Sequence, residues 1–434
     1  MTRRKKVHAG EWLTRGLATV GAGALILGTT TLLVDLFGSA LSYTLREKPR
    51  GSLDSDEFLQ FLSVVTDGSL RRSQVTRFRN GEQFYPAELE AIRRARQSIN
   101  LEYYEFGEDR VGGEMLEALV ERARAGIEVR MIVDAVGSFR THDGFFDGLR
   151  AAGGRMFWYN PLRLKTWQRI NNRTHRKLMV VDGQTGFIGG AGIADYWRYR
   201  TLQGPAWRDT VFRVEGQAVA GLISTFSENW LECAGEILSG PKQFGPPSDP
   251  DGAPGFVVIS TPHAGGTQAR ILFQVLIQCA QRSLRITTPY FLPDHSARQA
   301  LAEAARRGVR VEILTAGPYI DHPIVRRLSR ESSRRMLEAG ATIHEYQPSM
   351  IHAKLMTVDR QWSVVGSTNS DHRSLGLNDE VNLAVLDRDL AAVIESDFED
   401  DLRQSRPLTL DMLGRRGLLS REEQVLDHVV KWES

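Results

Sequence analysis

The chain has 434 residues with a formal net charge of +2, and 41 % of its residues are hydrophobic against 25 % that are charged. This length exceeds one ordinary domain and suits two globular units with terminal extensions. The composition is that of a packed protein and excludes a disordered chain. The small net charge argues against a dedicated nucleic-acid-binding protein, so we expect no nucleic-acid partner.

An uncharged segment, residues 16–34, lies near the N-terminus. As a helix it would extend about 28 Å, close to the thickness of the bilayer core. Five basic residues precede it and three follow it within residues 1–50, which predicts a cytoplasmic N-terminus and a protein body on the other side of the membrane. We therefore expect residues 1–50 to form a basic segment and a single transmembrane anchor. A cleaved signal peptide and a glycine-rich buried helix stay open as alternatives.

Beyond this segment, one order of elements occurs twice. Helical periodicity at 86–92 precedes a predicted strand at 98–106, a helix at 113–125 and a strand at 127–134. Further along the chain the same order is predicted at 271–279, 283–292, 300–307 and 309–315. Residues 124–130 (RAGIEVR) and 306–312 (RRGVRVE) match in residue type. The pattern indicates an internal duplication, with an α/β sheet in each half.

A segment rich in proline and glycine separates the two copies. Five prolines and four glycines fall between residues 240 and 255, which predicts a linker without a helix or a central strand. We accordingly expect a first half at 57–240, a linker at 241–255 and a second half at 256–405. Residues 406–434 are predicted to form a helical tail.

Each half carries one His-x-Lys-x4-Asp motif after its repeated block. Residues two apart on a strand point to the same face, so each motif histidine is expected beside the motif lysine. An imidazole can attack phosphorus or move a proton, and an ammonium group can offset charge on phosphoryl oxygens. A single strand histidine is usually a packing residue, but two matched motifs predict one duplicated site for phosphodiester chemistry. The motif residues are His175, Lys177 and Asp182, and His352, Lys354 and Asp359.

These motifs make the chain similar to the phospholipase D superfamily and, within it, to the bacterial cardiolipin synthases. The resemblance extends from about Phe58 to Pro407 and includes further segments at 189–195, 207–209, 289–293, 366–369 and 371–374. It implies two tandem α/β sandwich halves related by a pseudo-twofold axis, with one active site between them. It also implies that the reaction uses no metal and no other cofactor.

The resemblance further implies roles for individual residues. One histidine would form a phosphohistidine, and the other would protonate the leaving alcohol and deprotonate the incoming one; the near-symmetric motifs do not distinguish the two. Asp182 and Asp359 would support the motifs. Asp209 and Glu380 are candidates to orient the imidazoles through their second nitrogens. The residues expected to hold the phosphate are Lys177, Lys354, Ser367 and Asn369.

The sequence departs from the family pattern at one position. Asn369 lies seventeen residues after His352, whereas the matching place after His175 is Gly192. The family usually has a second asparagine there. Losing one polar donor from a phosphate site can cost a few kcal/mol if nothing replaces it.

The implied activity is phosphatidyl transfer in the inner membrane of a bacterium, in which two molecules of phosphatidylglycerol give cardiolipin and glycerol. A phospholipase D-type hydrolase is the alternative, because water in place of the alcohol would give phosphatidic acid. A nuclease of the same superfamily fits less well with the near-neutral charge and the predicted anchor. Two intact motifs argue against a non-enzymatic scaffold. Five aromatic residues near strand ends are expected either to wall the pocket or to pack in the core, namely Tyr103, Tyr104, Phe106, Tyr290 and Phe291.

Overall fold

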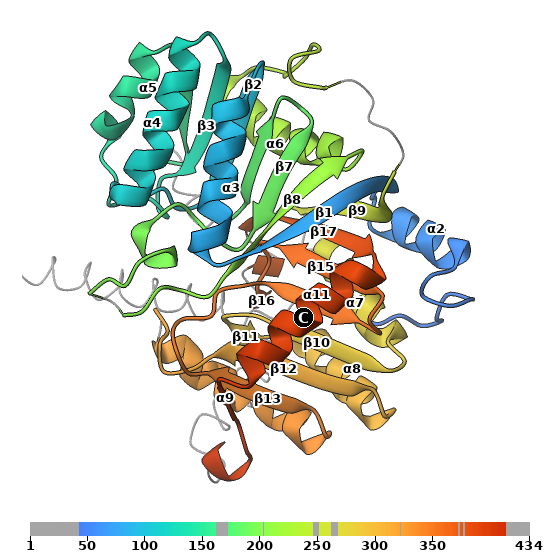
Figure 1. Cartoon of the computed structure of the whole chain (residues 1–434). Coiled ribbons are helices and arrows are strands. Elements are labelled where there is room, and N and C mark those ends of the chain that lie inside the picture. Colours follow the sequence, from blue (N-terminus) through green and yellow to red (C-terminus); the bar gives the residue numbers. More distant parts are fainter. Residues whose placement is uncertain are drawn as a thin grey trace, which may run out of the picture.

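The computed structural model describes residues 43–161, 172–202, 204–245, 251–261, 268–321, 323–371, 374–375 and 378–413. One mixed sheet of 16 strands crosses both halves of the molecule (Figure 1). The predicted anchor at 16–34 lies outside the described residues. Within them, no helix combines the length and the apolar character needed to cross a membrane.

The first half forms one end of the sheet, in the order β1-β8-β7-β6-β2-β3-β4. Its helices are α3 (Gly81–Arg94), α4 (Arg110–Arg124), α5 (Asp147–Ala151) and α6 (Val219–Ala234), with short 3-10 turns η1 (Asp143–Phe146) and η3 (Asp195–Trp197). Its strands are β1 (Arg71–Arg79), β2 (Ser98–Tyr103), β3 (Glu128–Asp134), β4 (Arg155–Tyr159), β5 (Arg173–Thr174), β6 (Lys177–Val181), β7 (Thr185–Gly189) and β8 (Thr210–Gly216).

The second half continues the sheet in the order β9-β17-β15-β14-β10-β12-β13-β18. Its helices are α2 (Asp56–Val65), α7 (Gln268–Cys279), α8 (His295–Arg306), α9 (Pro323–Glu338) and α11 (Arg388–Leu402), followed by η4 (Asp411–Leu413). Its strands are β9 (Ala253–Ser260), β10 (Ser283–Thr287), β11 (Phe291–Leu292), β12 (Arg310–Ala316), β13 (Thr342–Tyr346), β14 (Leu355–Val358), β15 (Trp362–Gly366), β16 (Ser370–Asp371), β17 (Asn378–Leu386) and β18 (Ser405–Pro407).

The two halves have the same topology, which confirms the predicted duplication. The order β1-β8-β7-β6-β2-β3-β4 corresponds strand by strand to β9-β17-β15-β14-β10-β12-β13. In both halves the last three strands of this order pair in parallel and the preceding ones pair antiparallel. Strands β1 and β9 pair with each other and join the halves into one sheet.

The duplicated blocks also share their helix boundaries. Asp109 caps α4 by accepting the backbone N–H of Gly112, and Asp294 caps α8 by accepting that of Ala297. Just beyond each helix stands a glycine in the left-handed region, Gly126 at φ 85° and Gly308 at φ 90°. A glycine adopts this conformation without a Cβ clash, so the chain can turn sharply into the next parallel strand.

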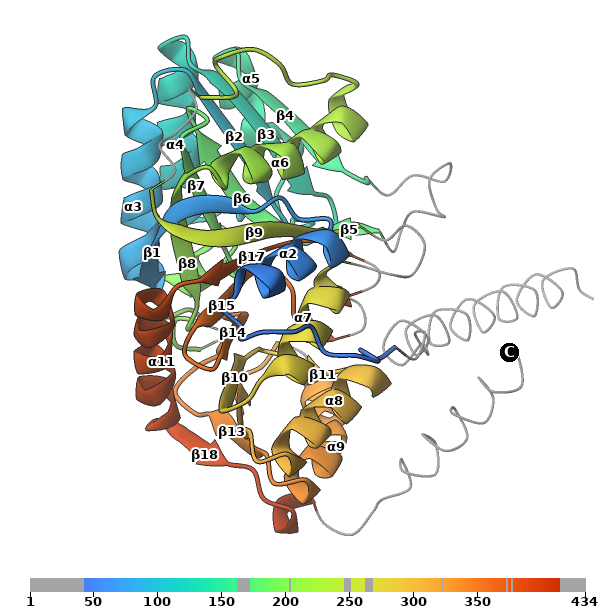
Figure 2. The same cartoon turned by 90° about the vertical axis from the view of Figure 1, so that its right-hand side faces the viewer.

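Helices cover both faces of the sheet. Figure 2 shows α3 and α11 on one side and α6, α7 and α8 on the other. The core of the second half includes Phe58, Leu59 and Leu62 of α2, although the sequence assigned residues from 57 onward to the first half. Helix α2 packs there because its apolar face meets α7 and the ring of Trp362, whose indole N–H donates to the carbonyl of Leu53.

Four sequence predictions need correction. The strand predicted at 283–292 is interrupted, because Phe291–Leu292 leaves the main sheet and pairs with β16. The segment predicted at 98–106 ends as a strand at Tyr103. The predicted linker at 241–255 ends in the central strand β9: Pro254 is tolerated because it stands near the start of that strand, where β9 pairs with β1 alone, and Gly255 is required because a Cβ would lie 2.6 Å from the carbonyl oxygen of Ala384. Of the tail predicted at 406–434, residues up to 407 lie in β18, and residues 414–434 fall outside the described residues.

Candidate active site

The two motif histidines lie just before strands β6 and β14, and not within strands as the sequence predicted. Each enters the site along a segment of the other half. The backbone N–H of His175 donates to the carbonyl of Asp379 at 2.9 Å, beside the parallel pairing of β5 with β17. The N–H of His352 donates to the carbonyl of Arg208 at 2.7 Å. Each motif therefore begins beside a backbone segment of the other half.

Because of this arrangement, each imidazole pairs with a carboxylate of the opposite half. His175 Nδ1 lies 2.9 Å from Glu380 Oε1, and His352 Nδ1 lies 2.9 Å from Asp209 Oδ2. Both histidine side chains are about one-tenth exposed, and both carboxylates are fully buried. A buried carboxylate that accepts the Nδ1 proton fixes the tautomer and leaves Nε2 as the reactive nitrogen.

The environment of His352 favours the neutral imidazole. Burial and the nearby Lys354 lower the pKa of His352 to about 4, although Asp209 acts in the opposite direction. Lys354 Nζ lies 2.8 Å from His352 Nδ1 and 3.0 Å from Nε2, and it donates to the backbone carbonyl of His352. Burial acts to raise the pKa of Asp209, but the hydrogen bond from His352 and the charge of Lys354 outweigh it and lower that pKa. The pair is thus an aspartate holding a neutral imidazole.

The two motif lysines share one electrostatic environment. Burial lowers the pKa of Lys354 to about 8. Burial and repulsion by Lys354 lower the pKa of Lys177 well below its usual value, while Glu380 and Asp209 act to raise it. Burial raises the pKa of Glu380 to about 8 against the charge of Lys177. Two buried ammonium groups that repel each other make a site in which a bound anion is stabilised.

The two loops that follow β7 and β15 supply different side chains to the site. Asn369 is buried, its Nδ2 lies 3.1 Å from Ser374 Oγ, and its Oδ1 has no hydrogen-bond partner in the described part of the chain. Turned over, the amide would accept from Ser374 and present its N–H2 group to a phosphate. The Ser367 hydroxyl donates to Glu380, so its contact is with the carboxylate that holds His175. Gly192, the counterpart of Asn369, offers no side chain.

The motif aspartates lie away from the imidazoles. Asp182 accepts the backbone N–H groups of Arg96, Gln97 and Ser98. Asp359 accepts those of the equivalent residues, 281–283, at 2.7 to 2.9 Å. Both aspartates therefore tie the end of the motif strand to the start of the adjacent antiparallel strand, β2 or β10.

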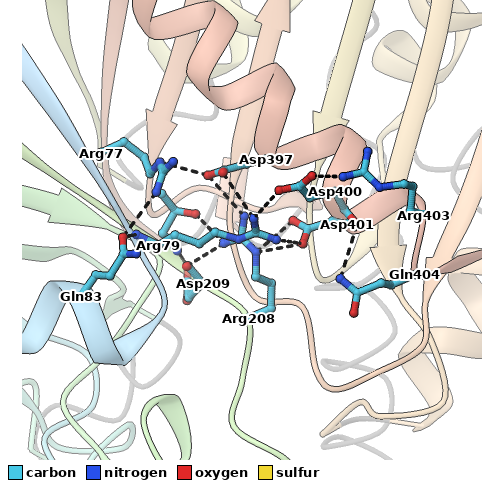
Figure 3. Close-up of polar contacts among 11 residues, drawn as sticks. Arg77, Arg79, Gln83, Arg208, Asp209, Asp397, Asp400, Asp401, Arg403 and Gln404 are labelled. Carbon is cyan, nitrogen blue, oxygen red and sulfur yellow. Dashed lines mark hydrogen bonds and ion pairs between the residues drawn. The ribbon is translucent and has the colours of Figure 1, made fainter.

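An arginine–aspartate cluster lies behind Asp209 and joins the halves (Figure 3). Arg208 Nε donates to Asp401 Oδ2 at 2.9 Å, and Arg208 Nη1 donates to the carbonyl of Asp209 at 2.7 Å. Arg79 of β1 also reaches Asp401, at 2.6 Å. The side chains of Arg208 and Asp401 are 3 % and 2 % exposed, so this ion pair is desolvated and holds the backbone of Asp209 against helix α11.

Aromatic rings enclose both imidazoles. The ring of Tyr104 lies 5.1 Å from that of His175, and the indoles of Trp197 and Trp207 lie 5.6 and 5.3 Å from the ring of His352. Of the five aromatics predicted to wall the pocket or pack in the core, Tyr103, Phe106 and Phe291 lie in the core. Trp197 was not among the predicted site residues; its place twenty-two residues after His175, which matches that of Ser374 after His352, is the signal that could have found it. Among the described residues, no group of three or more His, Cys, Asp or Glu side chains is arranged to hold a metal ion.

The fold is that of the phospholipase D-like proteins. The solved structure of phosphatidylserine synthase from Haemophilus influenzae Rd KW20 superposes with a TM-score of 0.62 at 16 % sequence identity, covering 81 % of this chain and 92 % of that one. A family model described as the PLD-like domain of cardiolipin synthase matches residues 89–198 and 274–402. Both matched segments contain one of the two motifs.

Curated relatives agree with this match. The chain is 32 % identical over 354 residues to the probable cardiolipin synthase YwiE of Bacillus subtilis (strain 168), covering 81 % of this chain and 71 % of that protein. It is 32 % identical over 429 residues to cardiolipin synthase 1 of Staphylococcus aureus (strain COL), covering 95 % and 86 % of the two chains. The chain therefore belongs to the cardiolipin synthase family of phospholipase D-like enzymes.

Proposed function

We propose that the protein transfers a phosphatidyl group from one phosphatidylglycerol to the glycerol hydroxyl of another, forming cardiolipin and releasing glycerol. The observation that carries this proposal is the pair of crossed contacts, His175 with Glu380 and His352 with Asp209, each at 2.9 Å. They fix both imidazoles through Nδ1 in one buried site that also contains Lys177 and Lys354. Membership in the cardiolipin synthase family supports the choice of lipid.

In the first step, Nε2 of one histidine attacks the phosphorus of the donor lipid. A P–N bond forms, the P–O bond to the glycerol headgroup breaks, and the second histidine, as imidazolium, gives its proton to the departing oxygen. The product is a phosphatidyl-histidine and free glycerol. Lys177, Lys354 and the amide of Asn369 stabilise the negative charge on the phosphoryl oxygens.

In the second step, the second histidine, now neutral, takes the proton of the acceptor hydroxyl. The acceptor oxygen attacks phosphorus, the P–N bond breaks, and the first histidine returns to its initial state. Water in the place of the acceptor would give phosphatidic acid, so the hydrolase alternative shares every residue of this site.

We further propose that the enzyme works at the bacterial inner membrane, held by a single helix at residues 16–34. The basic excess before this uncharged segment supports a cytoplasmic N-terminus and an active site on the opposite side. A reporter fused after residue 434 that is active only outside the cytoplasm is expected to show activity. Activity of a reporter that works only in the cytoplasm would instead show that the active site faces the cytoplasm.

The function can be tested with the full-length protein in detergent micelles that contain phosphatidylglycerol labelled in both the headgroup and the acyl chains. We expect labelled cardiolipin and free glycerol. His175→Ala and His352→Ala should each lower the rate about 10³-fold or more, because each removes a group that bonds to phosphorus or moves the proton. His295→Ala, at an exposed position on α8, serves as the matched control and should keep full activity.

Each other product has a definite meaning. Phosphatidic acid without cardiolipin would favour the hydrolase. Turnover that survives in either histidine variant would contradict the two-histidine mechanism. Mass spectrometry of quenched reactions in the two variants assigns the nucleophile, because the phosphatidyl group can accumulate only on a histidine that is still present.

A further inference from the structure

The residues twenty-two positions after the two motif histidines hold matched places in the two halves but differ in size. These residues are Trp197, counted from His175, and Ser374, counted from His352. The two side chains differ in chemistry, because one is an indole and the other a hydroxyl. Both follow the loop position, seventeen residues after the histidine, where Gly192 and Asn369 differ.

Trp197 makes this contact in the first half. Its indole Nε1–H donates to Asp209 Oδ2 at 3.0 Å, and the same oxygen lies 2.9 Å from His352 Nδ1. Its ring meets the imidazole of His352 edge to face at 5.6 Å. Trp197 is 2 % exposed, so the indole is fixed by packing and holds the carboxylate and the imidazole at once.

Ser374 holds the matched position in the second half. Its Oγ lies 3.5 Å from Asp371 Oδ2, and its hydroxyl acts to lower the pKa of Glu380, the partner of His175. Its Oγ also lies 3.1 Å from Asn369 Nδ2. A small side chain at this place therefore leaves room for the asparagine amide, and the two share one hydrogen-bonded corner of the pocket.

The same corner of the first half is filled in the opposite way. A Cβ at Gly192 would lie 2.8 and 2.9 Å from ring atoms of Trp197 and 2.9 Å from the carbonyl oxygen of Glu105. A side chain at Gly192 would require both the indole of Trp197 and the backbone at Glu105 to shift. The large residue and the small residue have exchanged positions between the two halves, as Gly192 with Trp197 and Asn369 with Ser374.

We propose that Trp197 is a positioning residue for the His352–Asp209 pair, at the place that Ser374 holds in the second half. Its indole takes the volume that a first-half asparagine would need. Of these two matched loop positions, only that of Asn369 then supplies an amide to the phosphate, and Gly192 is retained to accommodate the indole. This inference rests on the proposed transfer reaction, in which His352 is one of the two reacting imidazoles.

The test exchanges the pair between halves in the full-length enzyme. Gly192→Asn restores the usual family residue, yet it should lower kcat about 10- to 100-fold, because the clash displaces Trp197 and with it Asp209. Trp197→Ser should also lower kcat. The double variant Gly192→Asn/Trp197→Ser carries the second half's pair and should be more active than Gly192→Asn alone, so the two effects are coupled. Gly192→Asn with wild-type or higher kcat, or a double variant no better than Gly192→Asn, would overturn the inference.

Trp197→Phe tests the positioning role without a large loss of volume. It removes the N–H donated to Asp209, which leaves more negative charge facing His352 and raises the pKa of that imidazole. We expect a lower kcat, an unchanged KM and an acidic limb of the pH profile that moves to higher pH. Trp230→Phe is the control, since it removes an indole N–H bonded to Glu236 outside the site. An acidic limb that stays in place for Trp197→Phe would contradict the assignment.

A second readout separates this inference from the proposed function. Acylation of His352 by diethyl pyrocarbonate, followed peptide by peptide across pH, reports the titration of that imidazole without any lipid turnover. The midpoint should rise in Trp197→Phe and stay in place in Trp230→Phe. If the wild-type protein makes no cardiolipin but this midpoint shifts, the function fails and the positioning role stands.

Discussion

At the scale of single residues, the site depends on charges that burial makes costly. Lys177 and Lys354 are 2 % and 4 % exposed, and each is destabilised as a cation by loss of hydration. The Asp209 carboxylate offsets part of this cost but is already engaged by His352, and Glu380, whose pKa is raised to about 8, is ionised only above that pH. A bound phosphodiester supplies the negative charge that the two buried ammonium groups need as a partner. Binding is therefore strongest while both lysines are protonated.

The pKa of Lys354 gives this dependence a pH range. Lys354 has a pKa lowered to about 8, so it is charged below that pH and neutral above it. We expect kcat/KM to fall as the pH rises through about 8, since a neutral amine no longer attracts phosphate. Lys354→Arg should remove or raise this alkaline limb, because a guanidinium stays protonated. The profile is measured in mixed micelles, where the lipid phosphodiester does not titrate in this range.

A second group titrates in the same range and defines the contrary outcome. Burial raises the pKa of Glu380 to about 8 as well. An alkaline limb with the same midpoint in Lys354→Arg would assign the limb to Glu380 and not to the lysine. Glu380→Gln then provides the matched variant, since it keeps the shape of the side chain and cannot ionise.

At the scale of elements, the motif strands are fixed at both ends. The histidine end pairs with the opposite half. The aspartate end is bound to the residues just before and at the start of the adjacent strand, β2 or β10. Asp182 and Asp359 stand at φ 54° and 52°, in the left-handed region that asparagine and aspartate tolerate better than other residues with a Cβ. The motif aspartate is thus selected for its backbone conformation and for its two acceptor oxygens.

This role predicts a contrast between two substitutions. Asp359→Ala leaves three backbone N–H groups without their acceptor and puts alanine in a strained conformation, so it should lower the free energy of unfolding by about 3 kcal/mol. Asp359→Asn keeps one acceptor oxygen and the tolerated φ, and should cost about 1 kcal/mol or less. Thermal unfolding measures both. If Asp359→Asn lost its activity at an unchanged Tm, the carboxylate would take part in the chemistry.

The sequence predicted most of these elements but not their exact roles. Periodicity and the repeated RAGIEVR-like phrase located the parallel strands and their helices, since both signals are local. The pairing of His175 with Glu380 links residues 205 apart and depends on strands exchanged between the halves, which no local pattern encodes. The volume exchange at Gly192 and Trp197 is visible only after the halves are superposed, although equal spacing from the two histidines marks the positions.

At the scale of the whole molecule, the active site exists only while the halves stay in register. Strand pairing of β1 with β9 joins them at the centre of the sheet. The cluster of Arg79 and Arg208 with Asp397 and Asp401 joins them again beside Asp209. Helix α11 belongs to the second half and Asp209 to the first, so this cluster couples the fold of one half to the carboxylate of the other half that contacts His352.

Arg208 therefore links stability to activity. Arg208→Met should lower the free energy of unfolding by about 3–5 kcal/mol, because Asp401 remains buried with part of its charge uncompensated. It should also lower kcat, since the carbonyl of Asp209 loses the Arg208 donor at 2.7 Å and the His352 pair loosens. Arg403→Met is the control: it removes an exposed arginine paired with the neighbouring Asp400 and should change neither quantity appreciably.

Adding Asp401→Leu to Arg208→Met removes the uncompensated charge and should restore stability more fully than kcat, since packing replaces the ion pair while the bond to Asp209 stays absent. Equal recovery of both would show that the cluster supports the fold alone and does not position Asp209.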